Sequence, residues 1–224
     1  MNEANAFGLS ISLPLPFFYF LSPIFIQPMN AFFCRIIRTY RDIFGQVHDL
    51  EFLNDGTTFL STSTISRRSA IDKGIIAWDF DTGAQLSHQI YMESYTCPSI
   101  CVHPSKNHFV AQSGGDYIAI FSAKPPSFRL DKTKRFQGHT VSSFKVQCSF
   151  SPDGADLITG SADGSIYIYD WSSSNVIKKI DARRQVPDAF ADRSGDFSCL
   201  DAKFHPLIPG VIAAAVGKKL LIYK

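Results

Sequence analysis

Residues 138–170 read GHTVSSFKVQCSFSPDGADLITGSADGSIYIYD, and this stretch decides the fold. Two turn signals, at residues 151–154 and 160–164, divide it into apolar runs that have the length of a strand. Apolar residues alternate with period two within these runs, which favours strands over a helix. The last run closes on an aromatic residue and an acid, Tyr169-Asp170. The stretch therefore predicts one antiparallel unit of short strands.

The same unit recurs on both sides of this stretch. Each copy has an apolar strand, a turn, a second apolar strand and a third strand with a bulky aromatic residue near its end. These aromatic residues are Trp78, Phe121, Tyr169 and Tyr223. Their spacing of about 43 to 54 residues is close to the roughly 40 to 45 residues of a four-stranded propeller blade, and the longer spacings imply loop insertions. The sequence therefore predicts an all-β chain with units at about residues 47–95, 96–137, 138–180 and 181–224.

The signature of the third unit resembles the WD-repeat family. The features that carry the resemblance are Gly138-His139 before the first strand, Ser161 and Asp163 at the second hairpin, and Tyr169-Asp170 at the close of the third strand. The first unit adds Trp78-Asp79, and Asp72 precedes Trp78 by the same six positions that separate Asp163 from Tyr169. Within the family, residues 41–224 are similar to the group of WD repeat-containing protein 25 and pre-mRNA-processing factor 17.

This resemblance implies a partial WD-repeat β-propeller of about four blades. Since propellers of that group typically have seven blades, we expect the chain to be a truncated product or an incomplete gene model. In closed propellers the outer strand of the last blade usually comes from the other end of the chain. Residues 36–44 are a candidate for that strand.

The resemblance also implies a buried relay of hydrogen bonds. Its expected members are His139, Ser161, Asp163 and Tyr169 in the third unit, and Asp72 and Trp78 in the first. The first three should bond in series and end at Tyr169, with Asp163 accepting from the imidazole and from backbone N–H groups. Buried polar groups must be paired, so a complete relay stabilises a blade. Gly115 and Gly217 stand where the second and fourth units would need the aspartate, so we expect packing alone to hold those blades.

Residues 1–38 form an irregular apolar segment that differs from residues 39–224. From residue 4 to residue 34 the segment has no charged side chain, and four prolines interrupt it. A membrane helix needs about 20 apolar residues, but each proline would kink or break it. Three interpretations stay open: a start unrelated to the propeller, such as read-through of non-coding sequence, an apolar tail, or a membrane anchor.

The composition gives no sign of catalysis. The net charge of +2 is too small to make nucleic acid an obligatory partner, and the five cysteines form no disulfide pattern, which favours a reducing compartment. Motifs for serine hydrolases, zinc proteases and nucleotide binding are absent from the sequence. Cys97, Cys101 and His103 lack the further ligands that zinc would need, and His103 and His205 precede prolines in turns. We therefore expect no catalytic residue, no metal, no cofactor and no small-molecule substrate.

The function that these observations favour is the presentation of surfaces to partners. Two loops form the candidate partner surface, and the second of them mixes cations with aromatic residues. The residues of this surface are Arg67, Arg68, Arg183, Arg184, Phe190 and Arg193. The resemblance implies a non-catalytic scaffold for protein–protein or ribonucleoprotein assembly in the nucleus, related to pre-mRNA splicing and the spliceosome. The alternative is a generic WD-repeat adaptor, such as a ubiquitin-ligase substrate receptor or a signalling platform, in the nucleus or the cytoplasm.

Overall fold

The computed structural model describes residues 36–40, 45–53, 55–65, 74–87, 90–125, 127–142, 145–185 and 197–224. Its contacts divide the chain into two units, Met1–Ile37 and Arg38–Lys224, and all described strands belong to the second unit. The apolar segment up to residue 35, with its three interpretations, lies outside the described residues. The boundaries of the four sequence repeats, at about residues 47–95, 96–137, 138–180 and 181–224, remain a prediction.

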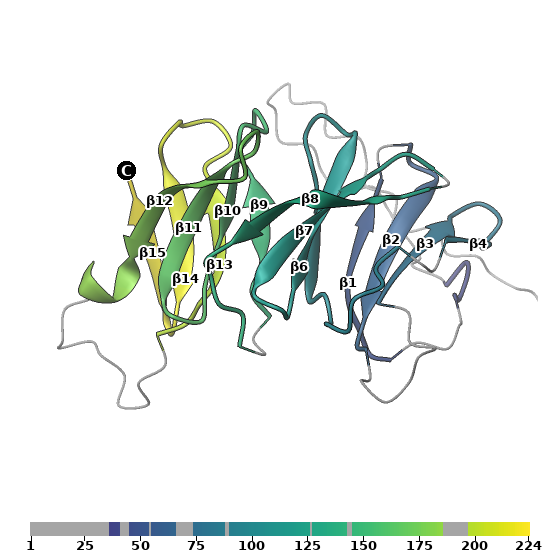
Figure 1. Cartoon of the computed structure of the whole chain (residues 1–224), viewed down its shortest axis with the longest axis horizontal. Coiled ribbons are helices and arrows are strands. Elements are labelled where there is room, and N and C mark those ends of the chain that lie inside the picture. Colours follow the sequence, from purple (N-terminus) through teal and green to yellow (C-terminus); the bar gives the residue numbers. More distant parts are fainter. Residues whose placement is uncertain are drawn as a thin grey trace, which may run out of the picture. The chain divides into compact units, whose positions relative to one another are not determined.

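Four antiparallel sheets, which we call blades 1 to 4, follow one another in chain order (Figure 1). Blade 1 contains β1 (Val47–Phe52), β2 (Thr58–Ser63), β3 (Ile75–Asp79) and β4 (Gln85–Ser87). Blade 2 contains β5 (Ser99–Val102), β6 (His108–Ser113), β7 (Tyr117–Ser122) and β8 (Leu130–Gln137). Blade 3 contains β9 (Cys148–Phe150), β10 (Asp156–Thr159), β11 (Ser165–Asp170) and β12 (Val176–Asp181). Blade 4 contains β13 (Cys199–Phe204), β14 (Ile212–Val216) and β15 (Lys219–Tyr223). The expected four-bladed partial propeller is confirmed.

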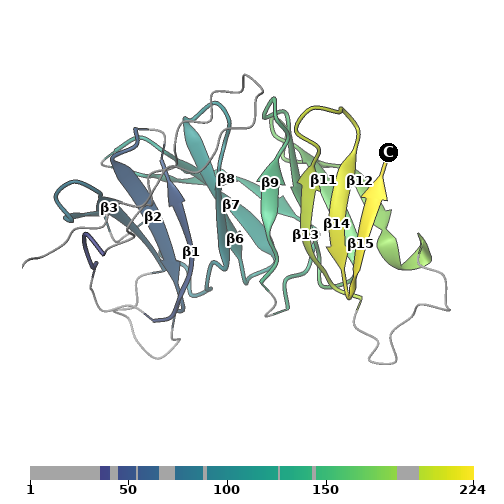
Figure 2. The same cartoon turned by 180° about the vertical axis from the view of Figure 1, so that it is seen from behind.

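Each blade is a meander in which neighbours in sequence are neighbours in the sheet. The first strands β1, β5, β9 and β13 contact one another in that order, so the blades stack side by side (Figure 2). The predicted aromatic residues lie on the third strands, with Trp78 in β3, Phe121 in β7, Tyr169 in β11 and Tyr223 in β15. The helical structure of the described residues is the 3-10 turn η1 (Ala182–Gln185), and among these residues we find no helix long and apolar enough to cross a bilayer.

One turn geometry joins the first two strands of blades 1, 2 and 3. In blade 3 the Ser151 N–H donates to the Asp156 carbonyl at 2.8 Å, and the Gly154 N–H donates to the Ser151 carbonyl at 2.9 Å. Leu53 and His103 make the corresponding pair of bonds in blades 1 and 2. The turn requires a left-handed residue, which Gly154 supplies with a φ of 75°. This repeat of the turn fixes which residues of the blades are equivalent.

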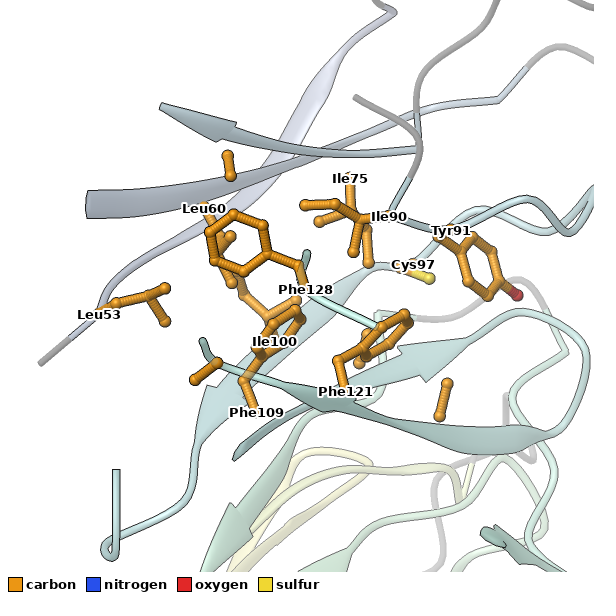
Figure 3. Close-up of a cluster of buried hydrophobic side chains, with 14 of the residues drawn as sticks. Leu53, Leu60, Ile75, Ile90, Tyr91, Cys97, Ile100, Phe109, Phe121 and Phe128 are labelled. Atoms are coloured by element: carbon orange, nitrogen blue, oxygen red, sulfur yellow. The ribbon is translucent and has the colours of Figure 1, made fainter. Parts of the chain in front are cut away.

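Side chains of the middle strands alternate between two neighbouring blades. In blade 2, Phe109 and Phe121 belong to a buried cluster shared with blade 1, which Figure 3 shows around Leu60 and Ile75. Val110, next to Phe109 in β6, belongs instead to the cluster shared with blade 3. A third cluster joins blade 3 to blade 4. Because both faces of blade 2 are covered, its third strand β7 is buried at nearly every position and is mostly apolar.

The segment expected to complete the last blade packs elsewhere. Residues 36–40 form no strand, and residues 41–44 lie outside the described part of the chain. The Tyr40 ring meets Phe59 and Trp78 of blade 1 edge-on, with ring centroids 4.9 and 5.5 Å apart. Its hydroxyl donates to the Phe80 carbonyl at 3.0 Å. These contacts with blade 1 take the place of pairing with β15, so the expectation for residues 36–40 is wrong.

Candidate functional site

The polar network of blade 3 is centred on His139, in the loop that enters the blade. The side chain is buried, with 2% of the residue exposed. Its Nδ1 lies 2.9 Å from the Tyr169 hydroxyl of β11, and its Nε2 lies 2.6 Å from the amide nitrogen of Gln112 in β6. Because an amide nitrogen only donates, Nε2 accepts and Nδ1 carries the proton that is donated to Tyr169. The imidazole therefore links blade 2 to blade 3.

Burial keeps this imidazole neutral. It lowers the pKa of His139 to about 4, although the carboxylates of Asp116 and Asp163 act in the opposite direction. The same burial raises the pKa of the Tyr169 phenol. Both members of the pair are therefore uncharged at neutral pH. A neutral, enclosed donor–acceptor pair suits a structural role, and it offers no base that a solvent-borne substrate could reach.

Ser161 and Asp163 hold the hairpin between β10 and β11. The Ser161 hydroxyl accepts from the Thr140 N–H at 3.0 Å, which ties the entering loop to the hairpin. One Asp163 oxygen accepts from the Ser165 N–H at 2.9 Å, and the other accepts from the Lys179 ammonium at 3.1 Å. Burial raises the pKa of Asp163, but the hydrogen bonds from Ser161, Ser165 and Lys179 outweigh it and hold the pKa at about 2.

The expected series of bonds differs from the structure, in which Tyr169 bonds to His139 and Asp163 accepts from the Tyr167 hydroxyl at 3.3 Å. Both ring nitrogens of His139 are occupied, by Gln112 and Tyr169, so the series does not run from the imidazole to Asp163. The reason is that the phenol of Tyr169 reaches the imidazole directly and Gln112 supplies a donor from the next blade. Gln112 was missed because no feature of a single unit reveals which residue a neighbouring blade presents.

In blade 1 the structure shows one of the two expected members. Trp78 donates its indole N–H to the Ser61 hydroxyl of β2 at 2.8 Å, so the aromatic residue of the third strand is bonded to the second strand. Asp72 lies outside the described residues.

Blade 2 is not held by packing alone, contrary to the expectation from Gly115. The Tyr91 hydroxyl lies 2.9 Å from the Ser113 hydroxyl and 2.6 Å from the Tyr117 hydroxyl. Tyr117 donates to Glu93, which accepts from Arg135 at 2.5 Å. Tyr91 precedes the turn residue His103 by the same twelve positions that separate His139 from Ser151, and this offset could have identified it.

The candidate partner surface is described only in part. Arg67, Arg68, Phe190 and Arg193 lie outside the described residues. Arg183 and Arg184 lie in η1, and each places its Nε 3.3 Å from a carboxylate oxygen of Asp181. The Arg184 side chain is 86% exposed, so its ion pair leaves most of the guanidinium accessible.

The two histidines of the His-Pro turns serve those turns. The Nδ1 of His103 accepts from the Ser105 N–H at 3.0 Å, and the Nδ1 of His205 accepts from the Leu207 N–H at 3.1 Å. Among the described residues no group of three or more His, Cys, Asp and Glu side chains could hold a metal ion.

The described cysteines are free thiols and are mostly buried. Cys97, Cys148 and Cys199 are exposed by 0%, 2% and 0%, and each lies in the first strand of its blade or just before it. Burial raises the pKa of all three thiols, that of Cys199 to about 12. These thiols are therefore unreactive in the folded chain.

Comparison with known proteins shows which sequences this chain is similar to. The family model for the WD domain, G-beta repeat, matches residues 130–170. Mouse WD repeat-containing protein 25 is 36% identical over 178 residues, which is 80% of this chain and 31% of the relative. Human pre-mRNA-processing factor 17 is 28% identical over 172 residues, 77% of this chain and 26% of the relative. The human U5 small nuclear ribonucleoprotein 40 kDa protein is 32% identical over 89 residues, 39% of this chain and 22% of the relative. The chain thus spans less than a third of each of these relatives.

Proposed function

Because this chain belongs to the WD-repeat family, we propose that it is a non-catalytic scaffold in a nuclear ribonucleoprotein assembly related to pre-mRNA splicing. The observation that carries the proposal is the burial of the His139 network between blades 2 and 3. The imidazole of His139 and the phenol of Tyr169, which could take part in a reaction elsewhere, are hydrogen-bonded in this network and hold the blades together. What the fold offers to other molecules is its loops and blade edges.

Two relatives support the splicing assignment through their names, which refer to pre-mRNA processing and to a small nuclear ribonucleoprotein. One propeller fold hosts many functions, so the assignment depends on partners and not on the fold. We place the partner surface at Arg67, Arg68, Arg183, Arg184, Phe190 and Arg193. The exposed guanidinium of Arg184 suits an acidic protein segment or a ribonucleoprotein.

The test is affinity purification of the tagged full-length protein from nuclear extract, with and without ribonuclease. We expect spliceosomal proteins and small nuclear RNA to be enriched over a tag-only control, and imaging to place the protein in the nucleus. Recovery of ubiquitin-ligase subunits in their place, or a protein confined to the cytoplasm, would reverse the assignment in favour of a generic adaptor.

The role of the surface is tested by charge reversal. Arg184→Glu should reduce the recovery of these partners severalfold, because the side chain is 86% exposed and its removal leaves the blades intact. The control is Lys124→Glu, which reverses an exposed cation after β7. Equal loss in both variants would point to net charge and contradict a local surface.

A further inference from the structure

A groove of about 480 Å³ lies between the β9–β10 turn of blade 3 and the β13–β14 turn of blade 4. Its lining is mostly apolar and includes Ile168, Ile177, Pro206, Leu207, Pro209 and Val211. Leu207 and Ile177 are 86% and 56% exposed, so aliphatic surface stands open to solvent around the groove. Open apolar surface of this kind is typical of a binding site.

The turn residue at the groove is smaller than its equivalents at the other two junctions. At the first junction Leu53 of blade 1 is buried in the cluster shared with blade 2. At the second junction His103 packs against Phe150 and Trp171, with centroids 4.7 and 4.5 Å apart, and its Nε2 bonds to the Gly154 carbonyl at 2.9 Å. At the third junction the equivalent residue is Ser151, whose hydroxyl turns back to Asp153 at 2.5 Å. The space that a leucine or histidine fills elsewhere is left open.

Two carboxylates give the groove a negative end. Asp153 and Asp156 both line it. Burial raises the pKa of Asp156, and the neighbouring charges that add to this effect are the carboxylates of Asp153 and Asp170. Among the described residues the Asp156 carboxylate has no hydrogen bond or ion pair. Lys178 also lines the groove, but no cation of the described part of the chain is among the charged groups that act on the pKa of Asp153 or Asp156. Within that part, these two carboxylates therefore lack a countercharge.

We propose that this groove docks a short peptide of a partner protein, which inserts an aliphatic side chain and places an adjacent lysine or arginine against Asp153 and Asp156. The aliphatic side chain takes the place that Leu53 and His103 fill at the other two junctions. The cation supplies the missing charge. The inference rests on the proposed scaffold role, since it names the kind of partner segment that one surface of the scaffold holds.

The test is fluorescence polarisation with the full-length protein and a labelled octapeptide that carries two leucines followed by two arginines in a glycine–serine frame. We expect micromolar binding, and at least tenfold weaker binding when glutamates replace the arginines or serines replace the leucines. Asp156→Lys should weaken binding at least tenfold, and Leu207→Ser severalfold. Leu207 is 86% exposed, so its change leaves folding intact. Asp81→Lys, which reverses an exposed carboxylate of blade 1, should leave affinity within twofold.

Asp156→Asn keeps the shape of the side chain and should weaken binding about threefold, which covers the case that the lysine variant fails to fold. Equal binding of the peptide that lacks leucine would reveal general attraction of cations and overturn the proposal. So would the absence of binding, or cross-links that place another segment of the same chain in the groove. If the peptide does not bind but spliceosomal partners still co-purify, the groove proposal fails and the scaffold role stands.

Discussion

Blades 2 and 3 build polar networks at equivalent positions from different side chains. In blade 3 the neutral imidazole of His139 is enclosed between two blades. In blade 2 the phenol of Tyr91 takes the equivalent place, and the network runs on to an ion pair between Glu93 and Arg135, whose side chains are 27% and 34% exposed. One network is closed off from solvent and the other reaches it. Since an unpaired polar group costs more where water cannot replace its partner, the closed network should be the more sensitive to change.

The largest effect should come from removing the centre of the closed network. His139→Ala leaves Gln112 and Tyr169 buried without their shared partner and opens a cavity, so we expect a loss of about 3 kcal/mol in the free energy of unfolding. Urea denaturation of the full-length protein, followed by circular dichroism, measures it. Lys124→Ala, an exposed change, should leave stability unaltered. A loss below about 1 kcal/mol would show that water enters the site. Blade 3 would then not differ from blade 2 in how closed its network is to solvent.

Acid should weaken the closed network through the same residue. The pKa of His139 is about 4 in the folded chain against 6.5 normally, so the unfolded chain takes up the proton first as the pH falls. Stability is fully present above pH 6.5 and falls between about pH 6.5 and 4, with a loss of about 2 kcal/mol from pH 7 to pH 5. Urea denaturation at both pH values measures this loss. His139→Gln, which does not titrate, should flatten the dependence, and an unchanged slope would assign it to other groups.

Blade 2 should respond at the opposite end of the pH scale. Burial, with the hydrogen bond to Glu93, raises the pKa of Tyr117 to about 12 from its normal 10. The folded chain therefore keeps the neutral phenol longer than the unfolded chain does. Its contribution to stability is complete below pH 10 and is lost as the pH rises from about 10 to 12. Urea denaturation across this range measures the loss, and the difference in ultraviolet titration between wild type and Tyr117→Phe measures the raised pKa.

Removing single hydroxyl groups should cost less free energy of unfolding than His139→Ala does. The loss should again be larger in blade 3 than in blade 2. Tyr169→Phe leaves the Nδ1 proton of His139 without an acceptor and should cost about 1.5 kcal/mol. Tyr91→Phe should cost about 1 kcal/mol, because Ser113 retains the Gly115 N–H as a partner and Tyr117 retains Glu93. Thermal and urea denaturation of both variants give the order. The reverse order would mean that the phenol relay, and not the imidazole, is the tighter network.

Replacing the cations that lie over the two networks should have the smallest effect on the free energy of unfolding. Arg135 lies 4.6 Å from the centre of the Tyr117 ring, and Lys179 lies 4.8 Å from the centre of the Tyr167 ring. Both are partly exposed, so Arg135→Met and Lys179→Met should each cost about 0.5 kcal/mol, and less in high salt. Urea denaturation in low and high salt measures both. A cost in blade 2 well above that in blade 3 would show that the ion pair between Glu93 and Arg135 stabilises its blade more than a partly exposed pair normally does.

The sequence predicts what a single blade contains and fails where two blades meet. The turns and the aromatic residues of the third strands follow from alternation within one unit, and the structure confirms them. Gln112 could not be predicted, because its partner His139 belongs to the next blade and nothing local indicates which side chains will face each other. Tyr91 could have been found from its offset to the turn, but a phenol does not match the family signature. The groove beside Ser151 depends on the absence of a large side chain, which becomes visible only when equivalent turns are compared.

The buried thiols can be used to measure local opening of the individual blades. Cys97, Cys148 and Cys199 mark blades 2, 3 and 4, and a thiol covered by packing is alkylated only when that packing is transiently lost. Labelling rates, resolved by mass spectrometry, would therefore rank the three blades by the free energy of their own opening fluctuations. A partner that seats between blades 3 and 4 would slow labelling of Cys199 first and leave Cys97 unchanged.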